Sequence, residues 1–181
     1  MNQLDALKVT QSDVVRQIEA FLRGAGASTG MKADLRRMNA LTDITNSSLH
    51  RILAMYVPEQ WVRTEDSLRR WALIVHVAAY QAKIETERVL SVGEAAYKSG
   101  MKEARLTAFL RSEGRGLFGA IGRFAKFSGS AGVRANLPEL AQYILWANDR
   151  SRRDSICARI AENFYRAEAA SQKTQSTEPT A

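Results

Sequence analysis

The chain has 181 residues, 45% hydrophobic and 25% charged, a balance typical of a soluble globular protein with one domain or two small ones. Its formal net charge is +7, and arginines outnumber lysines by 19 to 7; arginine is the residue that binds phosphate bidentately. The longest apolar run, residues 71–80, is far shorter than the roughly 20 residues of a membrane-spanning helix, and the single cysteine excludes an intrachain disulfide.

Helical periodicity dominates the first half of the chain. Residues 13–23 place apolar side chains on one face, and a glycine-containing loop separates them from a short helix at 32–39. The next helix spans residues 47–57 and ends before Pro58. Segment 65–84 is apolar nearly all round, which predicts a central and largely buried helix.

The second half continues as shorter helices separated by glycine and serine. The expected helices are 91–99, which opens with a capping-box pattern at Ser91, and then 102–112, 116–127, 138–148 and 151–169. No strand pattern of useful length appears. We therefore predict an all-α fold of about eight helices in two small bundles.

The domain boundaries are expected at small and polar residues. A short Gly/Ser hinge at 128–132 divides an N-terminal helical bundle, 1–128, from a C-terminal helical group, 129–170, that packs on it. Residues 171–181 are polar and rich in threonine and serine, which predicts a disordered tail.

The positive charge is concentrated in one stretch of the chain. Residues 98–166 carry 13 basic and 6 acidic side chains, whereas residues 1–97 carry 12 and 11. A charge focused on part of a fold is what a polyanion site needs, and the alternative is an ordinary solvated basic surface.

The basic residues of this stretch follow helix faces. Lys102 and Arg105 share one face of the 102–112 helix. Arg115, Arg123 and Lys126 run along one ridge of the following helix, and Arg152, Arg159 and Arg166 form a stripe of residues seven apart on the last helix. The tryptophans and tyrosines are assigned to packing, so the pattern favours phosphate contacts over base reading.

Glycine recurs every three residues along the 116–127 helix, at Gly116, Gly119 and Gly122. Each glycine costs a helix about 1 kcal/mol relative to alanine, so the repeat indicates a close backbone approach. The partner is either another helix, which is the preferred interpretation, or a phosphate chain.

Signals of enzyme chemistry are poor. His76 lies in the most apolar helix, where a hydrogen-bonded core histidine is expected, and Cys157 lies on an apolar helix face. No zinc-type cluster, P-loop, nucleophile elbow or dinucleotide fingerprint appears. We predict a protein without catalytic activity, metal or cofactor; an unfamiliar helical active site around His76 is the alternative.

The order of segments resembles the CasB family, the small subunit of the type I-E CRISPR Cascade complex. The residues that carry the resemblance lie between about Ala33 and Ala167, in segments 33–37, 67–71, 102–110, 136–141 and 163–165. Two features depart from the family pattern: segment 52–56 lacks an aromatic pair, and the tail past Ala170 has no counterpart.

The resemblance implies an all-helical, non-catalytic subunit present in two copies, head to tail, within the complex. It implies contacts with the guide-backbone and large subunits, with the guide RNA–DNA heteroduplex and with the displaced single-stranded DNA. By family position the strand contacts are Arg63, Arg105, Arg111, Arg123 and Arg152 or Arg153. Charge geometry adds Lys32, Lys102, Arg115 and Lys126.

The predicted function is therefore a subunit that holds the displaced non-target strand and stabilises the R-loop through sequence-independent phosphate contacts. The alternative is a helical transcriptional regulator that reads duplex DNA with a recognition helix. The absence of a signal peptide and of a membrane-spanning stretch predicts a cytoplasmic protein without membrane contact.

Overall fold

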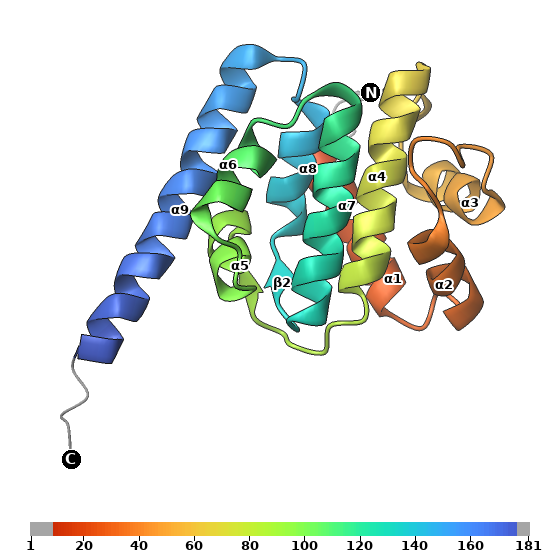
Figure 1. Ribbon diagram of the computed structural model, residues 1–181. Helices are drawn as coiled ribbons and strands as arrows, with labels where there is room; N and C mark the ends of the chain where they lie inside the picture. Colours follow the sequence, from red (N-terminus) through yellow and green to blue (C-terminus); the bar gives the residue numbers. More distant parts are fainter. Residues whose placement is uncertain (1–8, 177–181) are drawn as a thin grey trace, which may run out of the picture.

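The computed structural model describes residues 9–176, and these form nine α-helices, a 3-10 helix and two short strands (Figure 1). The helices are α1 (Gln11–Arg23), α2 (Thr29–Arg37), α3 (Ser47–Tyr56), α4 (Glu65–Gln81), α5 (Val92–Lys98), α6 (Glu103–Leu110), α7 (Gly114–Ser130), α8 (Leu137–Leu145) and α9 (Arg150–Ser176). The 3-10 helix η1 (Glu59–Trp61) precedes α4, and the strands are β1 (Val89–Leu90) and β2 (Arg134–Ala135). The predicted all-α fold class is confirmed.

Helix α4 is the central helix, as its apolar sequence predicts. It begins at a capping box between Thr64 and Ser67, and every side chain from Arg70 to Ala79 is buried. It packs against α1, α2, α3, α7 and α8. This packing fixes the position of α7, which lies beside α4 in Figure 1 and carries two of the five cations of the candidate interface.

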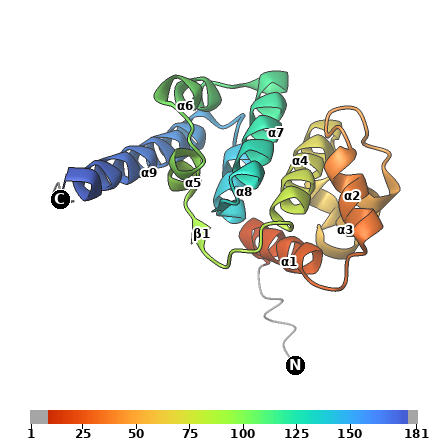
Figure 2. The ribbon, with the colours of Figure 1, turned by 60° about the horizontal axis from the view of Figure 1, so that its bottom comes forward.

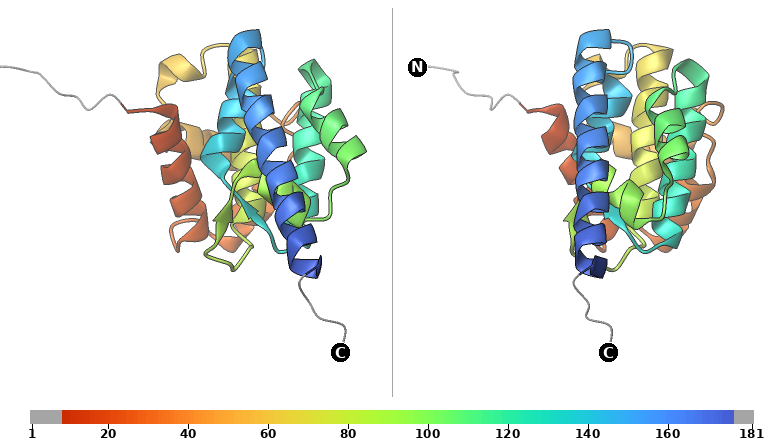
Figure 3. Two further views of the ribbon diagram at one scale, coloured as in Figure 1. Left: turned by 90° about the vertical axis from the view of Figure 1, so that its left-hand side faces the viewer. Right: turned by 60° about the vertical axis from the view of Figure 1, so that its left-hand side comes forward.

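Helix α9 crosses one side of the bundle, and its last turns extend beyond it (Figure 1 and Figure 3). Ile156, Ile160 and Phe164 form its buried face, which packs mainly on α5. The two backbones meet at Gly93, where an added Cβ would lie 2.7 Å from the backbone nitrogen of Phe164 and even closer to the carbonyl oxygen of Ile160. Only glycine fits this crossing without moving a helix.

The last helix is longer than the sequence predicts. We expected it to end near residue 169 and a disordered tail to cover 171–181, but α9 continues to Ser176. Alanine, glutamine and lysine are good helix formers, so a polar composition is compatible with an exposed helical extension. Residues 177–181 of the predicted tail lie outside the described residues.

Two strands form a small parallel sheet that the sequence did not predict. Val89 pairs with Arg134 and Leu90 with Ala135, and the backbone N–H of Asn136 donates to the carbonyl of Leu90 at 2.7 Å. Strands of two residues are too short to show a period-2 pattern. The pairing holds the segment before α5 beside the segment before α8.

The predicted hinge at 128–132 begins inside a helix. Helix α7 continues to Ser130, and Ser128 is fully buried within it. The chain turns at Ala131 and Gly132, where Gly132 has a φ of 66° that favours glycine. Buried apolar side chains from α1 to α9 form one cluster, and the division into an N-terminal bundle and a C-terminal group stays a prediction.

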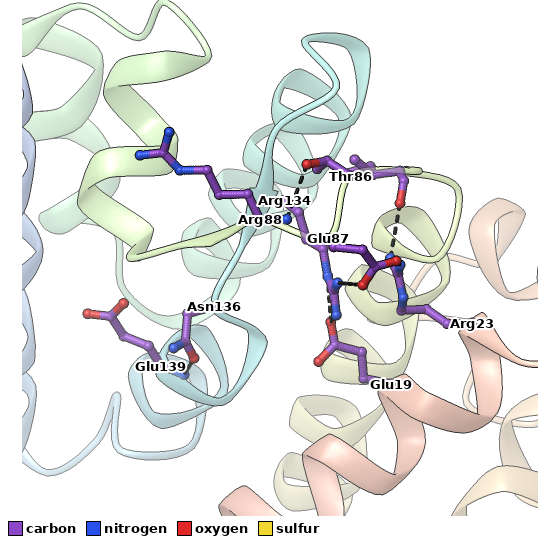
Figure 4. A network of polar contacts seen from close by, with 9 residues as sticks. Glu19, Arg23, Thr86, Glu87, Arg88, Arg134, Asn136 and Glu139 are labelled. Carbon is purple, nitrogen blue, oxygen red and sulfur yellow. Dashed lines mark hydrogen bonds and ion pairs between the residues drawn. The ribbon is translucent and has the colours of Figure 1, made fainter.

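A polar network ties α1 to β2 and to the loop after α4 (Figure 4). The guanidinium of Arg134 donates two hydrogen bonds to one carboxylate oxygen of Glu19, at 2.9 and 3.2 Å, and also lies 3.7 Å from Glu87. Glu87 in turn pairs with Arg23 at 2.9 Å. Arg134 and Glu19 are only 11% and 12% exposed, so the pair is shielded from water.

We expect Arg134→Lys to lower the free energy of unfolding by about 1.5 kcal/mol, because the ammonium keeps the charge but loses the double hydrogen bond to Glu19. Urea unfolding measures the change. The control is Arg16→Lys, because the Arg16–Asp13 pair is 65% and 48% exposed and contributes little. Equal losses in the two variants would contradict a structural role for the buried pair.

Candidate nucleic-acid interface

Two pockets flank α7, which lies between α6 on one side and α4 and α2 on the other (Figure 2). The α6–α7 pocket has a volume of about 580 Å³, and the α2–α7 pocket has a volume of about 360 Å³. Arg123 and Lys126 line both pockets, because they lie three residues apart on the exposed face of α7. Helix α7 therefore presents two basic side chains between the two pockets.

Three more arginines complete this basic region. Arg105 of α6 lines the α6–α7 pocket, and Arg36 and Arg37 at the end of α2 line the α2–α7 pocket. No acidic residue of the described chain lines either pocket. We call these five cations the basic surface: Arg36, Arg37, Arg105, Arg123 and Lys126.

Ion pairing distinguishes the basic surface from most, but not all, of the remaining arginines. Eleven arginines elsewhere lie within 4.0 Å of a carboxylate oxygen: Arg16, Arg23, Arg69, Arg70, Arg88, Arg134, Arg150, Arg152, Arg153, Arg159 and Arg166. Within the side chains that the structure describes, none of the five cations of the basic surface has such a partner. Arg37 lies close enough to Asp34 to interact with it electrostatically. The charge of the other four cations is therefore the part most available to an external anion.

Sequence reasoning found Arg105, Arg123 and Lys126 but not the two arginines of α2. Arg36 and Arg37 lie far from α7 in the sequence, and although they end segment 33–37, which carries the family resemblance, nothing in their local pattern assigns them to a binding site. Arg36 is held against α4 by a long hydrogen bond to the carbonyl of Ala79, at 3.5 Å. Only the packing of α2 on α4 brings them to the pocket beside α7.

Four other predicted contacts are exposed but lie outside the two pockets. Lys102 precedes α6, Arg111 follows it, Arg115 lies in the first turn of α7, and Arg63 precedes α4. Each lacks a carboxylate partner among the described residues. They extend the unpaired positive charge beyond the basic surface.

The remaining three predicted contacts are engaged within the protein. The ammonium of Lys32 donates to the carbonyl of Gly24 at 3.1 Å. The guanidinium of Arg152 stacks 3.9 Å from the ring centroid of Trp146 and pairs with Asp149.

Arg153 is the one predicted contact that is buried. It is only 8% exposed, pairs with Glu113, and donates hydrogen bonds to the carbonyls of Leu110 and Ser112. These bonds tie α9 to the turn between α6 and α7. Arg153 is a structural residue, and we leave it out of the candidate interface.

The glycine repeat of α7 does not mark a helix crossing. Among the described residues, no atom of a neighbouring element lies within 4 Å of a Cβ added at Gly116 or Gly122, and at Gly119 the nearest atom belongs to the side chain of Arg123. The preferred interpretation, packing against another helix, is therefore wrong. Gly119 and Gly122 instead line the α2–α7 pocket and leave the α7 backbone open to it.

His76 lies in the wall of the α2–α7 pocket as a buried, hydrogen-bonded histidine, which the sequence predicted. Its Nδ1 lies 2.9 Å from the carbonyl oxygen of Leu35, so this nitrogen carries the hydrogen. Burial lowers the pKa of His76, and the charge of Lys126 acts in the same direction against the hydrogen bond to Leu35. The imidazole is therefore neutral at pH 7 and adds no charge to the basic surface.

The family model of CRISPR-associated protein Cse2 matches residues 31–165, well over half of the chain. The chain belongs to the Cse2 family. Cse2 and CasB name the same family, the small subunit of the type I-E CRISPR Cascade complex, so the resemblance drawn from the sequence is confirmed. No curated protein and no solved structure matches the chain at a significant level.

The Cse2 family is a structural subunit of Cascade and is not a known enzyme, so this protein is a subunit of a complex with other Cascade proteins. The residues matched by the family model include all five cations of the basic surface. Among the described residues, no group of three or more His, Cys, Asp or Glu side chains is placed to hold a metal ion. No helix in the described part of the chain is long and apolar enough to cross a membrane.

Proposed function

We propose that this Cse2-family protein holds the displaced non-target DNA strand in Cascade and stabilises the R-loop through phosphate contacts made by its basic surface. The observation that carries the proposal is the set of five cations around α7 that lie within 4.0 Å of no carboxylate oxygen of the described residues. R-loop formation is a near-balanced exchange of one duplex for another, so modest contacts to the displaced strand shift it.

The arrangement of the cations fits a phosphate chain better than a base sequence. They lie on three different helices around two pockets, and sequence reading in duplex DNA needs several side chains on one element inserted into a groove. Phosphate contacts give binding that is indifferent to sequence and sensitive to salt. The guide RNA–DNA heteroduplex, the guide-backbone and large subunits and a second copy of this chain are the other partners that we propose.

A titration of the purified protein with single-stranded and double-stranded DNA tests the proposal. At about 50 mM salt we expect measurable, sequence-indifferent binding of single strands. If all five cations contact phosphates, log K falls against log salt with a slope of about −3.5, and affinity drops about 100-fold by about 200 mM salt. Fluorescence anisotropy at both salt concentrations measures both quantities.

Two results would contradict the proposal. Tight, salt-tolerant binding of one duplex sequence would favour a transcriptional regulator. Failure to bind single strands at low salt, combined with normal R-loop lifetimes in a Cascade complex lacking this subunit, would exclude a strand-holding role.

A further inference from the structure

The α6–α7 pocket has an apolar floor under a basic rim. Phe109 and Phe124 are 4% and 1% exposed, and Phe127 is partly buried beside them. Arg105, Arg123 and Lys126 stand at the rim. The volume of about 580 Å³ lies within the roughly 300–1,000 Å³ range of small-ligand sites.

Aromatic contacts and a hydrogen bond hold the side chains of the pocket floor in place. The ring of Phe109 packs on Phe124 at a centroid distance of 5.5 Å and on Tyr143 at 5.2 Å. The hydroxyl of Tyr143 donates to the carbonyl of Phe109 at 2.8 Å. Burial raises the pKa of Tyr143 to about 12, so this hydroxyl stays protonated and keeps its hydrogen bond. The pocket is therefore preformed rather than opened by its ligand.

The small side chains of Ala108 and Ala120 keep the pocket open. Ala108 is an exposed residue of α6, and Ala120 is a buried residue of α7 that faces the same space. Larger side chains at these positions would fill the hollow without removing any cation. This makes the pocket testable independently of the basic surface.

We infer that the α6–α7 pocket binds an unstacked nucleobase of the single strand, with the phosphates on either side of that nucleotide held by Arg105, Arg123 and Lys126. The inference rests on the proposed function, because it takes the displaced strand to run over the basic surface. A nucleotide joins a flat apolar ring to an anionic backbone, which matches an apolar floor beneath three cations, where the partly exposed Phe127 can contact the base. A base still paired in a duplex is not free to enter such a pocket.

The charge of the rim selects this occupant over other apolar groups. Within the described part of the chain, three cations and no acidic residue line the pocket, so a neutral or basic apolar segment of another protein would leave the cations unpaired. Contact with the partly exposed ring of Phe127 also tolerates every base, since each base has a π-face. The pocket therefore adds affinity for single strands without adding sequence preference.

An abasic oligonucleotide separates base binding from phosphate binding, because it keeps every phosphate and lacks every base. We expect the purified protein at low salt to bind a short oligothymidylate at least about fivefold more tightly than the abasic strand of equal length. Ala108→Leu should fill the pocket and bring the two affinities together while leaving the affinity for the abasic strand unchanged. Ala104→Leu is the matched control, because Ala104 is exposed one turn earlier on α6 and does not line the pocket.

The outcomes test base binding in the pocket separately from phosphate binding by the basic surface. Equal affinities of the wild-type protein for both strands would overturn base binding and leave phosphate holding in place. No binding of either strand would count against the proposed function itself. If Ala108→Leu released the subunit from Cascade while its preference for oligothymidylate persisted, the pocket would belong to a protein partner and the inference would be wrong.

Discussion

Replacing Gly93 with alanine is expected to detach α9 from the bundle and to lower the free energy of unfolding by about 3 kcal/mol or more. The added Cβ would press into the α9 backbone at Ile160 and Phe164, and backbone atoms cannot rotate away as a side chain can. Relief requires α9 to move as a unit, which exposes the face formed by Ile156, Ile160 and Phe164. Urea unfolding followed by far-UV circular dichroism measures the loss.

The same substitution in α7 is the control for this prediction. Gly122 lies in the middle of a helix, and a Cβ added there meets no neighbouring atom within 4 Å. Gly122→Ala should therefore raise the free energy of unfolding, by up to about 1 kcal/mol, through helix propensity alone. A Gly93→Ala protein as stable as the wild type would show that α5 and α9 do not cross as closely as described.

Reversing two charges of the basic surface should have the largest effect on DNA binding. We expect the Arg105→Glu/Arg123→Glu double variant to bind single-stranded DNA about 100-fold more weakly at low salt, because each change turns an attraction for phosphate into a repulsion. Both side chains are exposed and make no ion pair within the described part of the protein, so the fold should be retained. Cascade assembled with this variant should lose its R-loops faster.

A second double variant controls for the change in net charge. Arg16→Glu/Arg150→Glu alters the charge by the same amount at side chains that are 65% and 95% exposed and that lie outside the basic surface. This variant should bind DNA nearly as the wild type does, apart from a small loss through long-range electrostatics. If the two double variants lost affinity equally, net charge rather than the basic surface would explain binding, and our site assignment would be wrong.

Local sequence signals located most helices but misread two features that depend on distant contacts. The apolar circumference of α4 is enough to identify the central helix, because burial on all sides needs apolar residues on all sides. The glycines of α7 suggested a helix crossing, but no described helix crosses there. Gly93, which the sequence showed only as part of a capping pattern, lies where α5 and α9 cross. A glycine in a sequence shows where a crossing is possible and not which helix arrives there.

Some candidate binding residues could likewise be identified from the sequence, whereas others needed the tertiary structure. Charge counting pointed to the stretch that holds Arg105, Arg123 and Lys126, since a net charge can be read from composition alone. It did not separate these residues from Arg153, which has the same chemistry but is buried against Glu113 and two carbonyls. What separates Arg153 from the other arginines is its hydrogen-bond and ion-pair partners, and these lie about 40 residues away in the chain.

The sequence by itself determined the helical class, the central helix, the basic half of the chain and the family, because these follow from local periodicity, from composition and from the order of short motifs. Only the tertiary structure decided which cations stay unpaired and which of them share a pocket. Ion pairs and pocket walls join residues that are distant in sequence: packing on α4 brings the arginines of α2 to α7, and a short turn brings Arg105 of α6 to its other side.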